Sequence, residues 1–125
     1  MPFAALVLTA VLVAGSAPRN LLGPDGNELL RSCSATVRLS DGADLNPEET
    51  VRSMWCIGYV GGFLDGLSVM NWKGGATKVC LPTGGVTNDQ AARIVVKYLR
   101  ANPETLHQSG RISLLVATAE AFKCK

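Results

Sequence analysis

The sequence predicts an all-α protein, a small bundle of about four helices stapled by two disulfides and preceded by an N-terminal signal peptide. Three observations support this fold class. Apolar residues recur at helical spacing through nearly all of the chain that follows the leader. Two Asn-Pro-Glu segments, beginning at Asn46 and Asn102, are typical helix starts. The four cysteines are spaced too widely for a zinc ribbon or a redox motif, which favours structural disulfides.

Composition and charge exclude several functional classes. The chain has 125 residues, with 12 Lys and Arg against 10 Asp and Glu, so it holds one domain at most and is close to neutral. A net charge of +2 argues against a nucleic-acid binder, which normally carries a basic patch. One histidine and no HExxH, CxxC or phosphate-binding glycine motif leave little for a metal site or a hydrolase. We therefore expect no cofactor, no metal and no enzymatic activity.

Residues 1–17 have the features of a signal peptide, which leaves residues 18–125 as the mature domain. Residues 3–14 are apolar except for one threonine, and Gly15-Ser16-Ala17 supplies the small residues expected before cleavage. The apolar run is too short to span a bilayer comfortably. No lysine or arginine precedes it, and a buried or membrane-anchoring N-terminal helix is the alternative. Cleavage after Ala17 would give a periplasmic or secreted protein.

The cysteines indicate the same compartment. Two disulfides would each contribute about 2–4 kcal/mol to a domain of this size. The alternative is a cytosolic protein with four reduced, buried thiols. Four cysteines allow three connectivities, and the count alone does not choose among them. The residues concerned are Cys33, Cys56, Cys80 and Cys124.

The first helix is expected over Asn27–Ser34, after the turn signal Gly23-Pro24-Asp25-Gly26. Leu29 and Cys33 then fall on one face of that helix. The polar connector Ala35–Leu45 is expected to be a surface loop that can include an extra turn of helix.

The second helix is expected from Pro47 to about Asn71. It carries glycines every four residues, at Gly58, Gly62 and Gly66. Each interior glycine costs about 1 kcal/mol of helix propensity relative to alanine, so a compensating contact is required. The stripe therefore predicts close packing inside the fold, against a fourth helix lined with small residues.

A membrane-spanning second helix is the rejected alternative. The uninterrupted apolar run, Met54–Leu64, is far shorter than the span of a bilayer, and Asp65 ends it. A buried helix in a soluble domain fits this length better.

A glycine-rich loop covers residues 71–85 and leads to two further helices. Thr87 and Gln90 form a capping box at the start of the third helix, which ends at Asn102. The fourth helix is expected over roughly Pro103–Phe122. Its small residues, the expected partners of the glycine stripe, are Gly110, Ser113, Ala117 and Ala121.

This order bears on the disulfides. If the third and fourth helices form an antiparallel hairpin, Cys80 and Cys124 come to the same end of it. Cys33 can then pair with Cys56, which lies nearly three turns inside the second helix. The hairpin therefore favours the pairs Cys33–Cys56 and Cys80–Cys124.

Several polar and aromatic residues are candidate functional groups. Asp65 is expected to be a structural carboxylate that accepts hydrogen bonds from backbone amides or from a polar group near Thr87. His107 is expected at the surface or at a corner, because no second histidine accompanies it. The loop residues Trp72, Lys73 and Lys78 could anchor a partner, although Trp72 could equally cover the end of the second helix.

The order of these features resembles the Rap/Tai family of type VI secretion immunity proteins. The similarity covers nearly the whole mature chain. The chain departs from the family pattern at Lys123, where a proline is usual, and at the additional pair Gly84-Gly85. The residues that carry the resemblance are Cys33, Cys56-Ile57-Gly58-Tyr59-Val60-Gly61-Gly62 with Asp65, Cys80-Leu81-Pro82, Val86-Thr87 with Gln90, Tyr98-Leu99, Asn102-Pro103-Glu104 with Leu106-His107, and Ala121-Phe122-Lys123-Cys124.

The resemblance implies a small, exported, disulfide-bonded helical protein that binds a peptidoglycan amidase effector. It also implies inhibition by a loop that enters the effector's active-site cleft, and a homodimer is possible on this scaffold. The alternative function is a periplasmic housekeeping or stress protein, chaperone-like, with no dedicated toxin. A small hydrolase that uses Asp65 and His107 is disfavoured, because no nucleophile or second acid accompanies them.

Overall fold

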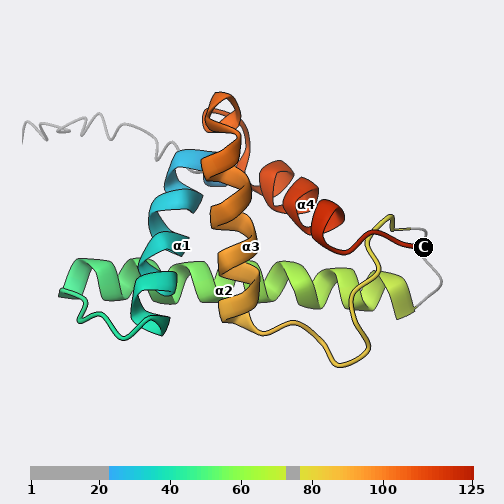
Figure 1. Cartoon of the computed structure of the whole chain (residues 1–125), viewed down its shortest axis with the longest axis horizontal. Helices are drawn as coiled ribbons and strands as arrows, with labels where there is room; N and C mark the ends of the chain where they lie inside the picture. The colour runs from blue at the N-terminus through green and yellow to red at the C-terminus, as the bar shows by residue number, and fades with distance from the viewer. Residues whose placement is uncertain (1–22, 73–76) are drawn as a thin grey trace, which may run out of the picture.

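The computed structural model describes residues 23–72 and 77–125. The expected signal peptide, residues 1–17, and Lys73 lie outside these ranges. The described residues form four α-helices and one short 3₁₀ helix (Figure 1). Their order is α1 (Gly26–Ser40), α2 (Pro47–Trp72), α3 (Asn88–Ala101), η2 (Pro103–Thr105) and α4 (Gly110–Ala121). The predicted all-α bundle is confirmed.

The long helix α2 forms one side of the molecule. Figure 1 shows α1 and α3 lying next to each other across α2, with α4 beside α3. The core lies where these helices cross. Its fully or almost fully buried apolar residues include Leu29, Cys33, Cys56, Val60, Val95, Leu99 and Leu114.

Helix α1 is longer than the sequence pattern predicted, because most of the expected connector is helical. Its start is fixed by Asp25, whose side chain accepts a hydrogen bond from the backbone N–H of Glu28 at 2.8 Å. The expected loop residue Thr36 is buried, and its hydroxyl donates to the backbone oxygen of Ser53 on α2 at 3.1 Å. Polar residues that suggested a loop are therefore part of the α1–α2 interface.

Helix α2 begins at the predicted signal. The side-chain oxygen of Asn46 accepts from the backbone N–H of Glu49 at 2.9 Å, and the Glu49 carboxylate accepts from the backbone N–H of Asn46 at 3.1 Å. This is a reciprocal capping box. The Arg38 guanidinium also binds the Glu49 carboxylate, which connects the end of α1 to the start of α2.

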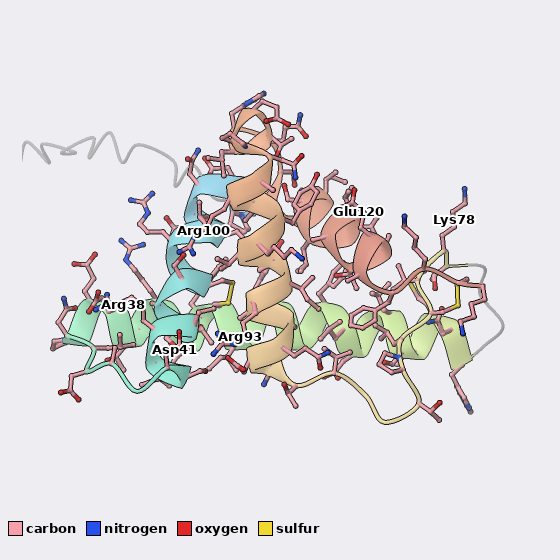
Figure 2. The ribbon with its side chains drawn as sticks, viewed as in Figure 1. Arg38, Asp41, Lys78, Arg93, Arg100 and Glu120 are labelled. Carbon is pink, nitrogen blue, oxygen red and sulfur yellow. A yellow bond between two sulfur atoms is a disulfide. The ribbon has the colours of Figure 1, made fainter. Side chains whose placement is uncertain are left out.

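Helix α3 also begins as predicted, since the Thr87 hydroxyl accepts from the backbone N–H of Gln90 at 3.1 Å. Arg93 of α3 links this helix to the end of α1, because it donates to Asp41 at 2.6 Å and to Asp89 at 3.1 Å. Figure 2 shows Arg93 and Asp41 on facing elements.

The prediction of one fourth helix over Pro103–Phe122 is wrong. The 3₁₀ turn η2 is followed by a break, and α4 begins only at Gly110. In the break, the backbone oxygens of Leu106 and Gln108 accept hydrogen bonds from the first backbone N–H groups of α1, each at 3.0 Å. The first N–H groups of α1 have no partner within their own helix, and these carbonyl groups accept from them. The same carbonyl groups are therefore not available to continue a helix.

Both predicted disulfides are confirmed. Cys33 and Cys56 join α1 to α2 with a Cα–Cα distance of 5.1 Å, and Cys80 and Cys124 are joined at 4.9 Å. Helices α3 and α4 pack against each other as the hairpin prediction required. Within the described ranges, no helix combines the length and hydropathy that crossing a membrane requires.

Candidate functional site

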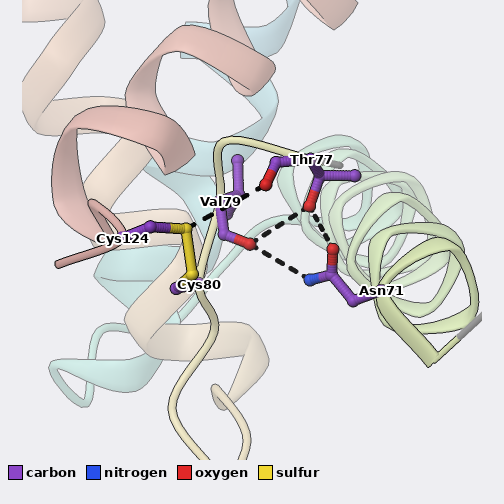
Figure 3. Close-up of a disulfide and its surroundings, with 5 residues drawn as sticks. All are labelled: Asn71, Thr77, Val79, Cys80 and Cys124. Atoms are coloured by element: carbon purple, nitrogen blue, oxygen red, sulfur yellow. Dashed lines mark hydrogen bonds between the residues drawn. A yellow bond between two sulfur atoms is a disulfide. The ribbon is translucent and has the colours of Figure 1, made fainter. Parts of the chain in front are cut away.

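The residues on either side of positions 73–76 are held together by hydrogen bonds. The Asn71 amide, near the end of α2, donates to the backbone oxygen of Val79 at 3.1 Å (Figure 3). The Thr77 hydroxyl donates to the same oxygen at 3.2 Å and also contacts the Asn71 side-chain oxygen. These hydrogen bonds therefore fix the end of α2 next to the segment that begins at Thr77.

The Cys80–Cys124 disulfide attaches this base to the end of α4. Next to it, the backbone N–H of Cys80 donates to the backbone oxygen of Phe122 at 2.9 Å, and the backbones of Val79 and Lys123 form an isolated antiparallel β-bridge. The Val79 side chain is 1% exposed and belongs to the core. We call the set Asn71, Thr77, Val79, Cys80 and Cys124 the loop base.

Two of the three predicted partner-binding residues can be placed beside the loop base. Trp72 is 82% exposed, so the alternative that it covers the end of α2 does not hold. Lys78 is exposed and, in Figure 2, points away from the body at the opposite end of the molecule from Arg38 and Asp41. The structure thus brings an exposed indole and an ammonium group to one end of the bundle.

The predicted packing of the glycine stripe inside the fold is wrong. Gly58, Gly62 and Gly66 are all exposed, and a Cβ atom added at any of them would meet nothing within 4 Å. Of the expected small partners, Gly110 instead packs against the backbone before α1, since a Cβ there would lie 2.9 Å from the Pro24 oxygen.

The glycine stripe is part of an outward-facing surface on α2 that is apolar apart from the exposed Asp65. Residues three and four apart on a helix share one face, and exposed apolar side chains accompany the glycines at this spacing. We call this surface the α2 outer face. It comprises Val51 (66% exposed), Met54 (68%), Val69 (61%) and the three glycines Gly58, Gly62 and Gly66.

Among the described residues, the structure shows no partner for the structural role predicted for Asp65. Its side chain is exposed and makes no hydrogen bond or ion pair with any described residue. His107 is exposed in the turn between η2 and α4, as expected for a surface residue. Among the described residues, no group of three potential ligands is placed to hold a metal ion.

An open groove of about 670 Å³ between α1 and α2 was not foreseen from the sequence. The rings of Trp55 and Tyr59 stack in it with centroids 4.9 Å apart. Arg52 donates to Glu28 at 3.0 Å and to Glu48 at 2.9 Å. Since the guanidinium binds both carboxylates, the groove is suited to contact rather than to proton transfer. The i, i+4 spacing of its aromatic rings was the signal available in the sequence.

A family model describing Rap1a immunity proteins matches residues 25–124. The chain belongs to this family. The match begins at the residue that caps α1 and ends at the last cysteine, so it includes all four α-helices and both disulfides. The resemblance found in the sequence is therefore confirmed. A search of curated proteins and a search of solved structures each found no match.

Family membership carries a function of binding, because an immunity protein acts on a cognate effector protein. It does not assign the contact residues. Three exposed regions of the described chain are candidates for the contact residues. They are the residues beside the loop base, the α2 outer face and the groove.

Proposed function

We propose that this Rap1a protein is an exported immunity protein that neutralises a peptidoglycan amidase effector of a type VI secretion system by occluding its active site. The observation that carries the proposal, beside the family, is Trp72. The Trp72 indole is 82% exposed and lies next to the cross-linked loop base. A tryptophan side chain is seldom so exposed unless it contacts another protein.

Pre-organisation supports a steric mechanism. Binding is weakened by the entropy lost when a loop is ordered, and that loss is smaller when the loop ends are already fixed. Here the hydrogen bonds of Asn71 and Thr77 fix one side of the base, and the Cys80–Cys124 bond fixes the other. We assign Trp72 as the apolar anchor, with Lys73 and Lys78 as charged contacts to the rim of the effector's cleft.

Export supports the same function. Both disulfides require an oxidising compartment, and the periplasm is where a cell-wall amidase meets its substrate. We propose that residues 1–17 are a signal peptide and that residues 18–125 are the mature domain. The inhibitor itself performs no catalysis and needs no cofactor.

We also propose that the mature protein is a homodimer through the α2 outer face. Three exposed glycines at four-residue spacing permit a second helix to approach closely, and Val51, Met54 and Val69 supply apolar area around them. Burial of such a face offsets the helix propensity that the glycines cost. This contact takes the place of the internal one predicted from the sequence.

The α2 outer face also favours one second candidate function. An exposed apolar helix face can hold unfolded clients, which is the property that a chaperone-like housekeeping protein with no dedicated toxin would use. The two functions differ in selectivity. A chaperone prevents aggregation of unrelated proteins, especially at acid pH, whereas an immunity protein inhibits one effector at equimolar concentration.

The experiment is an inhibition assay with a panel of purified type VI amidase effectors on peptidoglycan. The proposal requires stoichiometric inhibition of at least one of them by the mature protein. Inhibition of none, together with suppressed aggregation of unrelated clients, would favour the second function.

A further inference from the structure

We propose that the Cys80–Cys124 disulfide is a reducible clasp. A dithiol reductant, of the kind carried by thioredoxin-like proteins, would open this bond while Cys33–Cys56 stays closed. Opening would release the segment Thr77–Leu81 from the end of α4. The consequence for partner binding rests on the proposed function, whereas the selectivity of reduction does not.

The two disulfides differ in access. Cys33 and Cys56 are each 0% exposed, in the core between α1 and α2. Cys80 and Cys124 are both exposed. Thiol–disulfide exchange requires a thiolate to reach a sulfur atom, so the buried bond reacts only after the helices separate. The exposed bond can react in the folded protein.

Charge near the exposed bond favours the same reaction. Lys78, Lys123 and Lys125 lie within two residues of one of its cysteines, and all three are exposed. Figure 2 shows Lys78 on the segment that carries the disulfide. Positive charge attracts the incoming thiolate and stabilises the thiolate that leaves, which accelerates exchange.

The reaction balances with the dithiol as the only co-reactant. One thiolate of the reductant attacks Cys80 or Cys124 and forms a mixed disulfide, and the other cysteine leaves as a thiolate that takes a proton. The second thiol of the reductant then breaks the mixed disulfide. The products are two cysteine thiols and one oxidised reductant.

Few backbone contacts would hold the segment to the end of α4 once the bond is open, whereas the buried Val79 side chain and the Asn71 hydrogen bond keep it attached to the core and to α2. The backbone contacts with the end of α4 are the hydrogen bond from Cys80 N–H to Phe122 O and the bridge between Val79 and Lys123. The Cys124 sulfur also lies 4.0 Å from the backbone oxygen of Thr77 (Figure 3). The crossing of α1, α2 and α3 keeps its own disulfide. Reduction would therefore loosen the loop base without unfolding the bundle.

The direct test treats the oxidised mature protein with dithiothreitol under native conditions, with an iodoacetamide quench and peptide mapping over time. We expect alkylation at Cys80 and Cys124 at least about tenfold sooner than at Cys33 and Cys56. Equal rates, or earlier reduction of Cys33–Cys56, would overturn the proposal.

A second measurement follows the backbone. Amide hydrogen exchange at position 80 should rise by at least about tenfold after selective reduction. The intact disulfide restricts the locally unfolded state of this segment, and reduction removes that restriction. The double variant Cys80→Ser/Cys124→Ser should reproduce that rise. Its matched control, Cys33→Ala/Cys56→Ala, should leave the exchange at position 80 low while lowering the Tm. Unchanged exchange at position 80 in the selectively reduced protein would show that the bond is no clasp.

The third measurement links the clasp to function. With an amidase that the oxidised protein inhibits, selective reduction should weaken inhibition by at least about tenfold. Equal inhibition by the two forms would overturn the link between clasp and binding. If the oxidised protein inhibits no amidase, the proposed function fails, and the alkylation and exchange results still decide the clasp.

Discussion

Gly26 and Leu106 are in backbone contact, since a Cβ atom added at Gly26 would lie 2.9 Å from both the Cα and the backbone oxygen of Leu106. Gly26 opens α1, and Leu106 lies in the break before α4. The contact therefore joins two segments that are 80 positions apart in the chain. It explains why the fourth helix is interrupted where helix-forming residues alone would continue it.

We predict that Gly26→Ala destabilises the protein by about 1–3 kcal/mol, because the Leu106 backbone has to move to admit the methyl group. Chemical denaturation of the oxidised protein measures the effect. A matched control is Gly62→Ala, on the exposed side of α2, where the same methyl group meets open space. Equal stability of Gly26→Ala and the wild type would show that the two segments are not in contact.

The α2 outer face leads to the opposite prediction for a glycine. In the monomer, Gly62→Ala should stabilise α2 by up to about 1 kcal/mol, because alanine has the higher helix propensity and no neighbour is displaced. Gly62→Leu should also leave the monomer folded, since the longer side chain extends into solvent.

The same pair of variants tests the homodimer. Gly62→Leu should abolish it, while Gly62→Ala retains it, because only the larger side chain prevents close approach of two helices. Light scattering and unfolding, both at several protein concentrations, separate the two effects. A dimer that persists with leucine at this position would place the interface elsewhere.

The capping box of α2 predicts a dependence on pH. The backbone N–H of Asn46 and then the Arg38 guanidinium hold the pKa of the Glu49 carboxyl below its usual value. Because the folded pKa lies below the unfolded one, the stabilisation is complete above about pH 4.3 and is lost as the pH falls through the folded pKa. We therefore expect Glu49→Gln to lower the Tm at pH 7, with a difference from wild type that shrinks below about pH 4.

Glu104→Gln is the control for this prediction. The Glu104 carboxylate is exposed and has no hydrogen bond or ion pair with the described residues. The control should therefore melt with the wild type from pH 7 to pH 3. A Glu49→Gln variant that behaves like the control would show that the capping box adds nothing to stability.

Local signals in the sequence predicted much of the fold. The start of α2 at Asn46 and of α3 at Thr87 depends on residues no more than three positions apart, so it can be read directly. Both disulfides followed from a hairpin of neighbouring helices. These features require no knowledge of distant contacts.

The predictions that failed depend on distant contacts. Thr36 is polar, and only its hydrogen bond to Ser53 on another helix explains why it is helical and buried. The break before Gly110 is set by hydrogen bonds to the start of α1. The stripe at Gly62 indicated close packing, but its spacing cannot distinguish a contact inside the fold from one with another molecule.

The candidate site was predictable only in part. An aromatic residue in a glycine-rich loop identified Trp72, although the sequence left open whether it was core. The groove around Trp55 was missed, because α1 and α2 form it together and its charged residues are spread over both helices.

We propose that Trp72 and Lys78 supply the contacts that inhibit an amidase effector. The deciding measurement is the apparent inhibition constant against the responsive amidase for wild type and for Trp72→Ala/Lys78→Ala. The matched control is Leu39→Ala/Lys97→Ala, which removes an exposed apolar and an exposed basic side chain from α1 and α3. We predict at least about a 30-fold loss of inhibition for the first variant, little change for the control, and nearly equal Tm values. Full inhibition by a stable Trp72→Ala/Lys78→Ala variant would contradict the account.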